Sequence, residues 1–157
     1  MRVALAALTI IAVACGGREQ GGAAQTETAV EAPATPTPTP GAVTGAVREV
    51  RMVGTADGRF LYEPASLTIR VGDRVRWVNV SGGPHNVAFY ADRIPPGAGA
   101  FLQAAMTRRI GDLAGELLFE PNAVFEIGFA GAPPGTYDYF CTPHEMLGMK
   151  GTLTIVQ

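Results

Sequence analysis

Histidine and cysteine, the residues that most often bind transition metals, are scarce in this 157-residue chain, which has only two of each. Enzymes with several metal ions need more imidazole and thiolate ligands than this, so most of that class is excluded. Charged residues make up only 17% of the chain, and 12 basic residues nearly balance 14 acidic ones. Such a balance provides no strongly basic surface, so nucleic acid is not expected as a partner.

The N-terminus begins with an apolar run that is too short to cross a bilayer, which takes about 20 residues. Residues 3–14 are apolar except for Thr9, and they follow the single basic residue Arg2. A basic residue, about a dozen apolar residues and a small residue before a break are typical of a secretory signal peptide. We therefore expect residues 1–14 to be a signal and the protein to be exported, to a bacterial periplasm or the cell surface.

The signal-like run ends on a cysteine that suggests a lipid anchor. Ala12-Val13-Ala14-Cys15 resembles the lipobox of bacterial lipoproteins, although that motif usually has leucine where this chain has Ala12. The resemblance implies cleavage before Cys15 and a lipid on its thiol, which would attach the protein to a membrane. The alternative is an ordinary signal that is cleaved nearby, with Cys15 incidental.

Residues 15–46 have the composition of a linker. They are rich in glycine, alanine and threonine, and residues 33–40 alternate proline with other small residues. Such a segment cannot bury enough apolar surface to offset the entropy of ordering it. The sequence therefore predicts a disordered stalk that carries no chemistry and separates the anchor from a folded domain at residues 47–157.

The folded domain shows short apolar runs separated by glycine and proline. In one run, Val75 and Trp77 share a face while Arg74 and Arg76 point away, which is the period of a β-strand. The predicted strands cover residues 47–53, 66–71, 74–80, 86–90, 124–129, 136–141 and 152–156. Runs at this spacing predict an all-β sandwich of about seven to eight strands.

One segment of the domain has a different period. Five of its residues are spaced like one face of a short helix: Phe101, Leu102, Ala105, Met106 and Arg109. We expect one short helix in a long connection at residues 91–122. Two roles stay open for it, packing against the sandwich or presenting a surface to a partner.

The residues with the most distinctive chemistry lie near the C-terminus. Cys141, His144 and Met149 fall within nine residues, between the end of one predicted strand and the start of the next. A loop between strands can direct three side chains to one point. The second histidine, His85, follows the strand at 74–80. Two imidazoles, a thiolate and a weak axial thioether suit one copper ion that alternates between Cu(I) and Cu(II).

This pattern resembles the plastocyanin-like blue copper proteins of the cupredoxin family. The residues that carry the resemblance are 60–69, Val71-Gly72-Asp73, Pro84-His85-Asn86-Val87, Pro134-Gly135-Thr136-Tyr137 and the Cys-x-x-His-x-x-x-x-Met spacing from residue 141. The resemblance implies a Greek-key sandwich. It also implies that copper is bound by His85, Cys141, His144 and Met149, and that Met146, although close in sequence, is not a ligand. Asn86 is expected to connect the His85 loop to the Cys141 loop.

The chain departs from the plant members of that family in two ways. Phe140 stands before the cysteine, where the plant proteins have an aromatic residue with a hydroxyl, and there is no run of acidic residues. Because of these two differences, a docking surface of the plant type is not expected, whereas the predicted copper site is unaffected.

The implied function is electron transfer without enzymatic activity. The resemblance implies a monomer whose redox partners, such as c-type cytochromes or membrane redox complexes, dock near His144. A copper oxidase would need further histidines, and none remain. Delivery or storage of copper is the main alternative, although the five methionines form no Met-rich motif. A metal-free sandwich is the other alternative, and the intact set of ligands argues against it.

Overall fold

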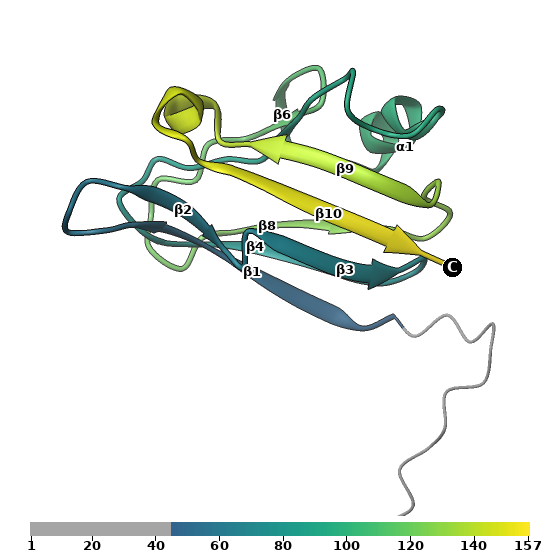
Figure 1. Ribbon diagram of the computed structural model, residues 1–157, viewed down its shortest axis with the longest axis horizontal. Coiled ribbons are helices and arrows are strands. Elements are labelled where there is room, and N and C mark those ends of the chain that lie inside the picture. The colour runs from purple at the N-terminus through teal and green to yellow at the C-terminus, as the bar shows by residue number, and fades with distance from the viewer. Residues whose placement is uncertain (1–44) are drawn as a thin grey trace, which may run out of the picture. The chain divides into compact units, whose positions relative to one another are not determined.

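Alternating apolar residues fold the chain into two packed sheets, as expected (Figure 1). The computed structural model describes residues 45–157. The predicted signal at residues 1–14, Cys15 and the predicted stalk as far as residue 44 lie outside the described residues. None of the helices in the described part is long and apolar enough to cross a membrane.

The first sheet has four strands in the order β2-β1-β4-β8. Strand β1 pairs in parallel with β4 and antiparallel with β2, and β4 pairs antiparallel with β8. The bounds of these strands are β1 Val47–Gly54, β2 Phe60–Glu63, β4 Arg74–Ser81 and β8 Val124–Gly128.

The second sheet has six strands in the order β3-β10-β9-β5-β7-β6. Strand β10 lies between β3, its parallel neighbour, and β9, its antiparallel neighbour. The bounds are β3 Ser66–Arg70, β5 Ala88–Phe89, β6 Arg109–Gly111, β7 Ala114–Gly115, β9 Gly135–Phe140 and β10 Lys150–Val156. The connection from β9 to β10 is a 3-10 helix, η1 Thr142–Leu147, and Figure 1 shows it at the opposite end of the sandwich from the C-terminus.

The space between the sheets is filled by inward-facing side chains at every second strand position. Val75 and Trp77 on β4 are fully buried, whereas Arg74 is exposed and Arg76 is half-buried, as their alternation predicts. Trp77 packs edge-on against Tyr139, with 5.7 Å between ring centroids. Edge-to-face pairs of this kind fix the relative position of the two sheets.

The predicted helix exists, but its bounds were wrong. Helix α1 covers Ala98–Ala105, so Arg109 lies on β6 instead of the helix. Ala98 and Leu102 are buried and Met106, at the C-terminal cap, is 1% exposed. The helix therefore packs against the sandwich, which is the first of the two roles left open for it.

The remaining differences concern short elements. Residues 45–157 form ten strands because β2, β6 and β7, of two to four residues, lie outside the predicted set. The strand predicted at 86–90 is reduced to the two residues of β5. Elements this short carry too few residues for a period of two to be recognised.

Candidate metal centre

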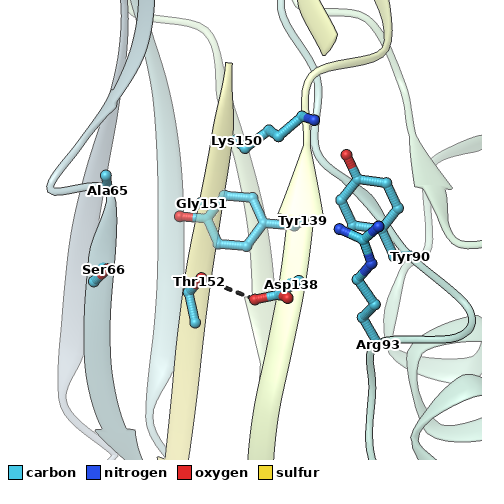
Figure 2. Close-up of a pocket in the computed structure, with 9 residues that line it drawn as sticks. All are labelled: Ala65, Ser66, Tyr90, Arg93, Asp138, Tyr139, Lys150, Gly151 and Thr152. Atoms are coloured by element: carbon cyan, nitrogen blue, oxygen red, sulfur yellow. Dashed lines mark hydrogen bonds between the residues drawn. The ribbon is translucent and has the colours of Figure 1, made fainter. Parts of the chain in front are cut away.

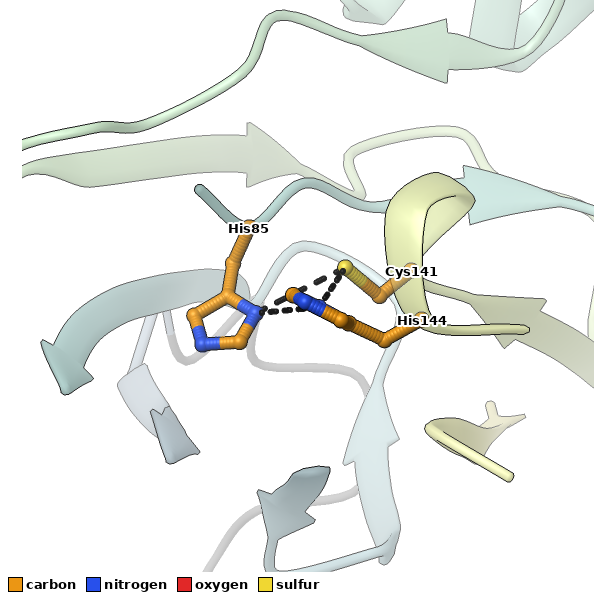
Figure 3. Close-up of side chains that lie close together, drawn as sticks. All are labelled: His85, Cys141 and His144. Atoms are coloured by element: carbon orange, nitrogen blue, oxygen red, sulfur yellow. Dashed lines mark hydrogen bonds between the residues drawn. The ribbon is translucent and has the colours of Figure 1, made fainter. Parts of the chain in front are cut away.

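Three nitrogen and sulfur donors converge at the end of the sandwich that holds η1. The Nδ1 atoms of His85 and His144 are 3.1 Å apart, and the Sγ atom of Cys141 lies 3.6 Å from the first and 3.4 Å from the second. Figure 3 shows the two rings and the sulfur directed toward one another. All three residues are buried, and among the described residues they form the one group of this kind.

The size of this triangle fits a transition-metal ion. A point equally distant from the three donor atoms lies about 2.0 Å from each of them, which matches a metal–imidazole bond and is slightly shorter than a metal–thiolate bond. A thiolate with two imidazoles is the donor set that copper electron-transfer sites use. The residues that the structure brings together therefore fit the predicted copper ion.

His85 is fixed by hydrogen bonds on both its backbone and its ring. Its backbone exchanges two hydrogen bonds with Leu118, of 3.1 and 2.8 Å. Its Nε2 lies 2.9 Å from the carbonyl oxygen of Ser81, which can only accept, so Nε2 carries the proton. In the neutral ring Nδ1 then presents its lone pair to the site. Burial lowers the pKa of His85 and favours this neutral form, while the Ser81 contact acts in the opposite direction.

Cys141 comes directly after β9, and its side chain is fully buried. Burial raises the pKa of its thiol, and hydrogen bonds from the backbone of Asn86 and His144 partly offset this effect. A metal ion that binds here must therefore displace the thiol proton. Among the described residues Cys141 is the one free cysteine, so no disulfide competes for its sulfur.

His144 lies on a short turn instead of a strand. Pro143 stands at the first turn of η1 and Gly148 ends it in the left-handed conformation, at φ 86°. The His144 side chain is 9% exposed, whereas His85 is 0% exposed. Burial and the neighbouring His85 both lower the pKa of His144, so it too is held as a neutral ligand.

The two methionines of this loop have opposite environments. Met149 is fully buried, and Met146 is 94% exposed. The backbone of Met149 donates to the carbonyl of His144 and accepts from the N–H of Cys141, both at 3.1 Å. These contacts place Met149 beside the donor triangle and leave Met146 outside it.

Asn86 links the two segments that carry the donors. Its Oδ1 accepts from the backbone N–H of Thr142 at 2.7 Å, and its Nδ2 donates to the Thr142 hydroxyl at 3.0 Å. Nδ2 also donates to the Gly115 carbonyl at 3.0 Å. Because Asn86 follows His85 and Thr142 follows Cys141, these bonds fix the distance between His85 and Cys141.

A shallow hollow of about 230 Å³ lies on the outer side of β9 and β10 (Figure 2). Four of the residues that line it pair with one another: Thr152 donates to Asp138 at 2.8 Å, and the Arg93 guanidinium lies 4.4 Å from the Tyr90 ring centroid. Tyr90 also donates to Glu145 on η1, at 2.7 Å. Tyr90, at the edge of the hollow, therefore supports the loop that carries His144. The described residues that line the hollow form no cluster of metal-binding side chains.

Several residues that touch the site have no signal in the sequence. Ser81 binds the ring of His85, Glu145 anchors η1 to Tyr90, and the Phe60 ring stacks on His144. Tyr90 and Glu145 are 55 residues apart in the chain. Contacts over such separations depend on the pairing of the sheets, which a single sequence does not specify.

Comparison with known proteins covers the same part of the chain. The family described as "Copper binding proteins, plastocyanin/azurin family" matches residues 49–156. Plastocyanin from Scenedesmus fuscus is 40% identical over 103 residues, which cover 66% of this chain and 94% of that protein. Plastocyanin from Synechococcus sp. (strain JA-2-3B'a(2-13)) is 41% identical over 103 residues, or 66% of this chain and 69% of that protein.

Solved structures agree with the sequence comparison. The oxidized form of plastocyanin from Dryopteris crassirhizoma is 34% identical, with a TM-score of 0.54. The match covers 69% of this chain and 100% of that one. The donor triangle and Met149 both lie within residues 49–156, the range that the family comparison matches.

Proposed function

The chain belongs to the plastocyanin/azurin family of copper-binding proteins, and from this membership we propose that it is an exported carrier of single electrons. Proteins of this family carry electrons and are not enzymes. The observation that carries the proposal is the buried triangle of two Nδ1 atoms and one Sγ atom, with sides of 3.1 to 3.6 Å.

The proposed ligands are His85, Cys141 and His144, with Met149 as the weak axial ligand. Copper held by such a set takes up and releases one electron as it alternates between Cu(II) and Cu(I). The role of the protein is to keep the donors in one place. Electron transfer is fast when little rearrangement accompanies the change of charge, and the hydrogen bonds of His85 and Asn86 restrict such rearrangement.

The Cys141 sulfur is tuned by its surroundings. Backbone hydrogen bonds from Asn86 and His144 favour the charged thiolate, whereas burial disfavours it. Hydrogen bonds to the sulfur and an apolar shell are the two features through which a protein adjusts the reduction potential of such a site. Asn86 therefore has two roles, in that it joins the ligand segments and contributes to the potential.

Electrons would enter and leave at His144. It is the more exposed of the two histidines, and its neighbours Met146 and Leu147 are 94% and 61% exposed. A redox protein such as a c-type cytochrome or a membrane redox complex would dock on this apolar surface. Weak redox encounters bury small interfaces, which suits a monomeric carrier that must dissociate quickly.

Export and anchoring follow from the N-terminal sequence. The signal-like residues 1–14 support export, and Cys15 after the small residues 12–14 supports attachment of a lipid. Residues 16–46 would then separate the copper domain from the membrane surface. Mass spectrometry of the protein from its host cells tests this: a lipid adduct on an N-terminal Cys15 supports the anchor, and an unmodified N-terminus elsewhere contradicts it.

The visible absorption spectrum tests the copper site. The purified protein is measured before and after one equivalent of Cu(II), with Cys141→Ser as the matched variant that replaces only the sulfur. We expect an intense blue band that ascorbate bleaches and that the variant lacks. A wild-type protein that binds copper without this band would contradict the electron-carrier function.

A further inference from the structure

The ring of Phe60 lies face to face with the ring of His144. Their centroids are 3.8 Å apart and their planes differ by 6°. The same phenylalanine meets His85 edge-on, with 6.0 Å between centroids and 67° between planes. One apolar ring therefore contacts both imidazoles of the metal centre.

Two glycines make room for this ring at the end of the first sheet. Phe60 is the first residue of β2 and pairs with Gly54 of β1, and Gly82 follows β4. A Cβ atom on either glycine would lie 3.3 Å from the Phe60 ring and less than 3 Å from the Cα of the other glycine. Gly82 also has a φ of 76°, which disfavours any side chain. Side chains larger than glycine at positions 54 and 82 would therefore occupy the space that the Phe60 ring needs.

The same strand ends hold His85. Ser81 donates from its hydroxyl to the Gly54 carbonyl at 2.9 Å, and its own carbonyl accepts from the His85 ring. His144, in contrast, belongs to the loop of the second sheet. The stacked ring therefore gives His144 a contact with the sheet that holds the other histidine.

We propose that Phe60 is a positioning residue of the metal centre, which holds the His144 ring by stacking and keeps water from one of its faces. The inference rests on the proposed function, because it takes His144 as a copper ligand. It explains how a ligand on a six-residue 3-10 helix keeps its place. Short 3-10 turns have poor hydrogen-bond geometry and hold their side chains weakly.

Two measurable properties follow from this role. An apolar cover disfavours the more highly charged Cu(II) state, so removing it lowers the reduction potential. A His144 ring without its stacking partner is freer to rotate away, so Cu(I) is released faster. Loss of one aromatic pair corresponds to a roughly three- to tenfold increase in that rate.

The experiment compares three substitutions of the same residue in the full-length protein. Phe60→Ala removes both cover and ring, Phe60→Leu keeps an apolar cover without a flat ring, and Phe60→Tyr keeps the ring. The midpoint potential is measured by voltammetry, and the release rate by capture of Cu(I) with excess bicinchoninate. Phe101→Leu is the control, because that ring packs on Phe129, with 6.1 Å between centroids, instead of on a histidine.

We expect Phe60→Ala to lower the potential and to release Cu(I) three- to tenfold faster. Phe60→Leu should retain most of the potential but not the slow release, and Phe60→Tyr and the control should match the wild type. Equal potentials and release rates in the wild type, Phe60→Ala and Phe60→Leu would overturn the proposal. Equal release in the wild type and Phe60→Leu would overturn the role of stacking.

A measurement on the wild type keeps the test independent of how the variants fold. In the Cu(I) protein, nuclear Overhauser contacts between the ring protons of Phe60 and His144 are expected, and their absence would contradict the proposal. The proposed function fails in a different way, through a wild-type protein that shows no blue band with Cu(II).

Discussion

The two histidines of the metal centre belong to regions that are built differently. The inner region, residues 79–86, is attached to both sheets: it begins on β4, and Asn86 donates to the Gly115 carbonyl on β7. His85 is 0% exposed, its backbone is bridged to Leu118 and its ring is bonded to Ser81. The ligand loop, residues 141–149, is mostly the 3-10 helix η1, and its Met146 is 94% exposed.

This contrast suits the two requirements of an electron carrier. The inner region fixes His85 by hydrogen bonds, so as a copper ligand His85 would change position little between oxidation states. The ligand loop places the other histidine nearer the surface, at 9% exposed, where a proposed partner would be separated from it by a short distance. Asn86 joins the two regions through its hydrogen bonds to Thr142, so the inner region also restrains the position of the ligand loop.

The largest effect is expected from breaking this joint. Asn86→Ala leaves the backbone N–H of Thr142 and the carbonyl of Gly115 without the partners that they have now. Unsatisfied buried groups of this kind cost about 1–3 kcal/mol each, so we expect a loss of roughly 2–4 kcal/mol in the free energy of unfolding. Urea denaturation of the metal-free protein measures it. Asn122→Gly, an exposed position with a φ of 67°, is the control, and an equal loss there would contradict the assignment.

A pair of tyrosines compares the two regions directly. Tyr62 donates to the Asn86 carbonyl in the buried inner region, at 2.6 Å, and Tyr90 donates to Glu145 on the ligand loop, at 2.7 Å. Tyr62→Phe leaves the buried Asn86 carbonyl without this donor and should lower the free energy of unfolding by about 1–2 kcal/mol. After Tyr90→Phe, Glu145 can bind water instead, so the loss should be about 0.5 kcal/mol. Equal costs in urea denaturation would show that the two regions are equally rigid.

The same tyrosines make stability depend on alkaline pH. Burial raises the pKa of Tyr62 well above 10, and burial and Glu145 raise that of Tyr90 to about 12. Above pH 10 the unfolded chain releases these protons while the folded chain keeps them, so stability is complete below pH 10 and falls as pH rises. Unfolding measured from pH 9 to 12 should show this fall, reduced in Tyr62→Phe. A flat profile would contradict the burial of Tyr62.

The smallest effect is expected from a substitution on the exposed face of the ligand loop. It should change the rate of electron exchange and leave stability unchanged. Leu147 is 61% exposed, so Leu147→Asp should leave the fold unchanged and place a charge on the proposed docking surface. We expect exchange with a c-type cytochrome to slow about fivefold, equivalent to ~1 kcal/mol of docking energy. Val47→Asp, at the 53% exposed start of β1, is the control. Stopped-flow rates that fall equally in both variants would place docking elsewhere.

The features that could be predicted from the sequence are those that depend on local patterns. Alternation at residues 74–77 predicted a buried Trp77, and the family resemblance that rested on the spacing of Cys141, His144 and Met149 is confirmed, as is the β-sandwich. The convergence of Cys141 and His144 follows from their position on one short loop. The strand at β2 was missed, because it has four residues and ends before a proline.

The contacts that hold the site in place could not be predicted in the same way. Phe60 and His144 are stacked although 83 residues lie between them in the chain, and Ser81 meets His85 across a turn. The first contact depends on how the two sheets pack together, and the second on the conformation of the residues after β4, and alternation specifies neither. The helix bounds were displaced because the apolar spacing continues through Met106 beyond the last helical turn.

The central claim is that one copper ion stays in this site while electrons pass through it. The most direct test takes the protein through repeated cycles of ascorbate reduction and ferricyanide oxidation in the presence of bicinchoninate, and follows the blue band. We expect the band to return to its full height in every cycle and the chelator to stay colourless. A band that shrinks with each cycle while copper passes to the chelator would contradict the account and indicate a protein that delivers copper.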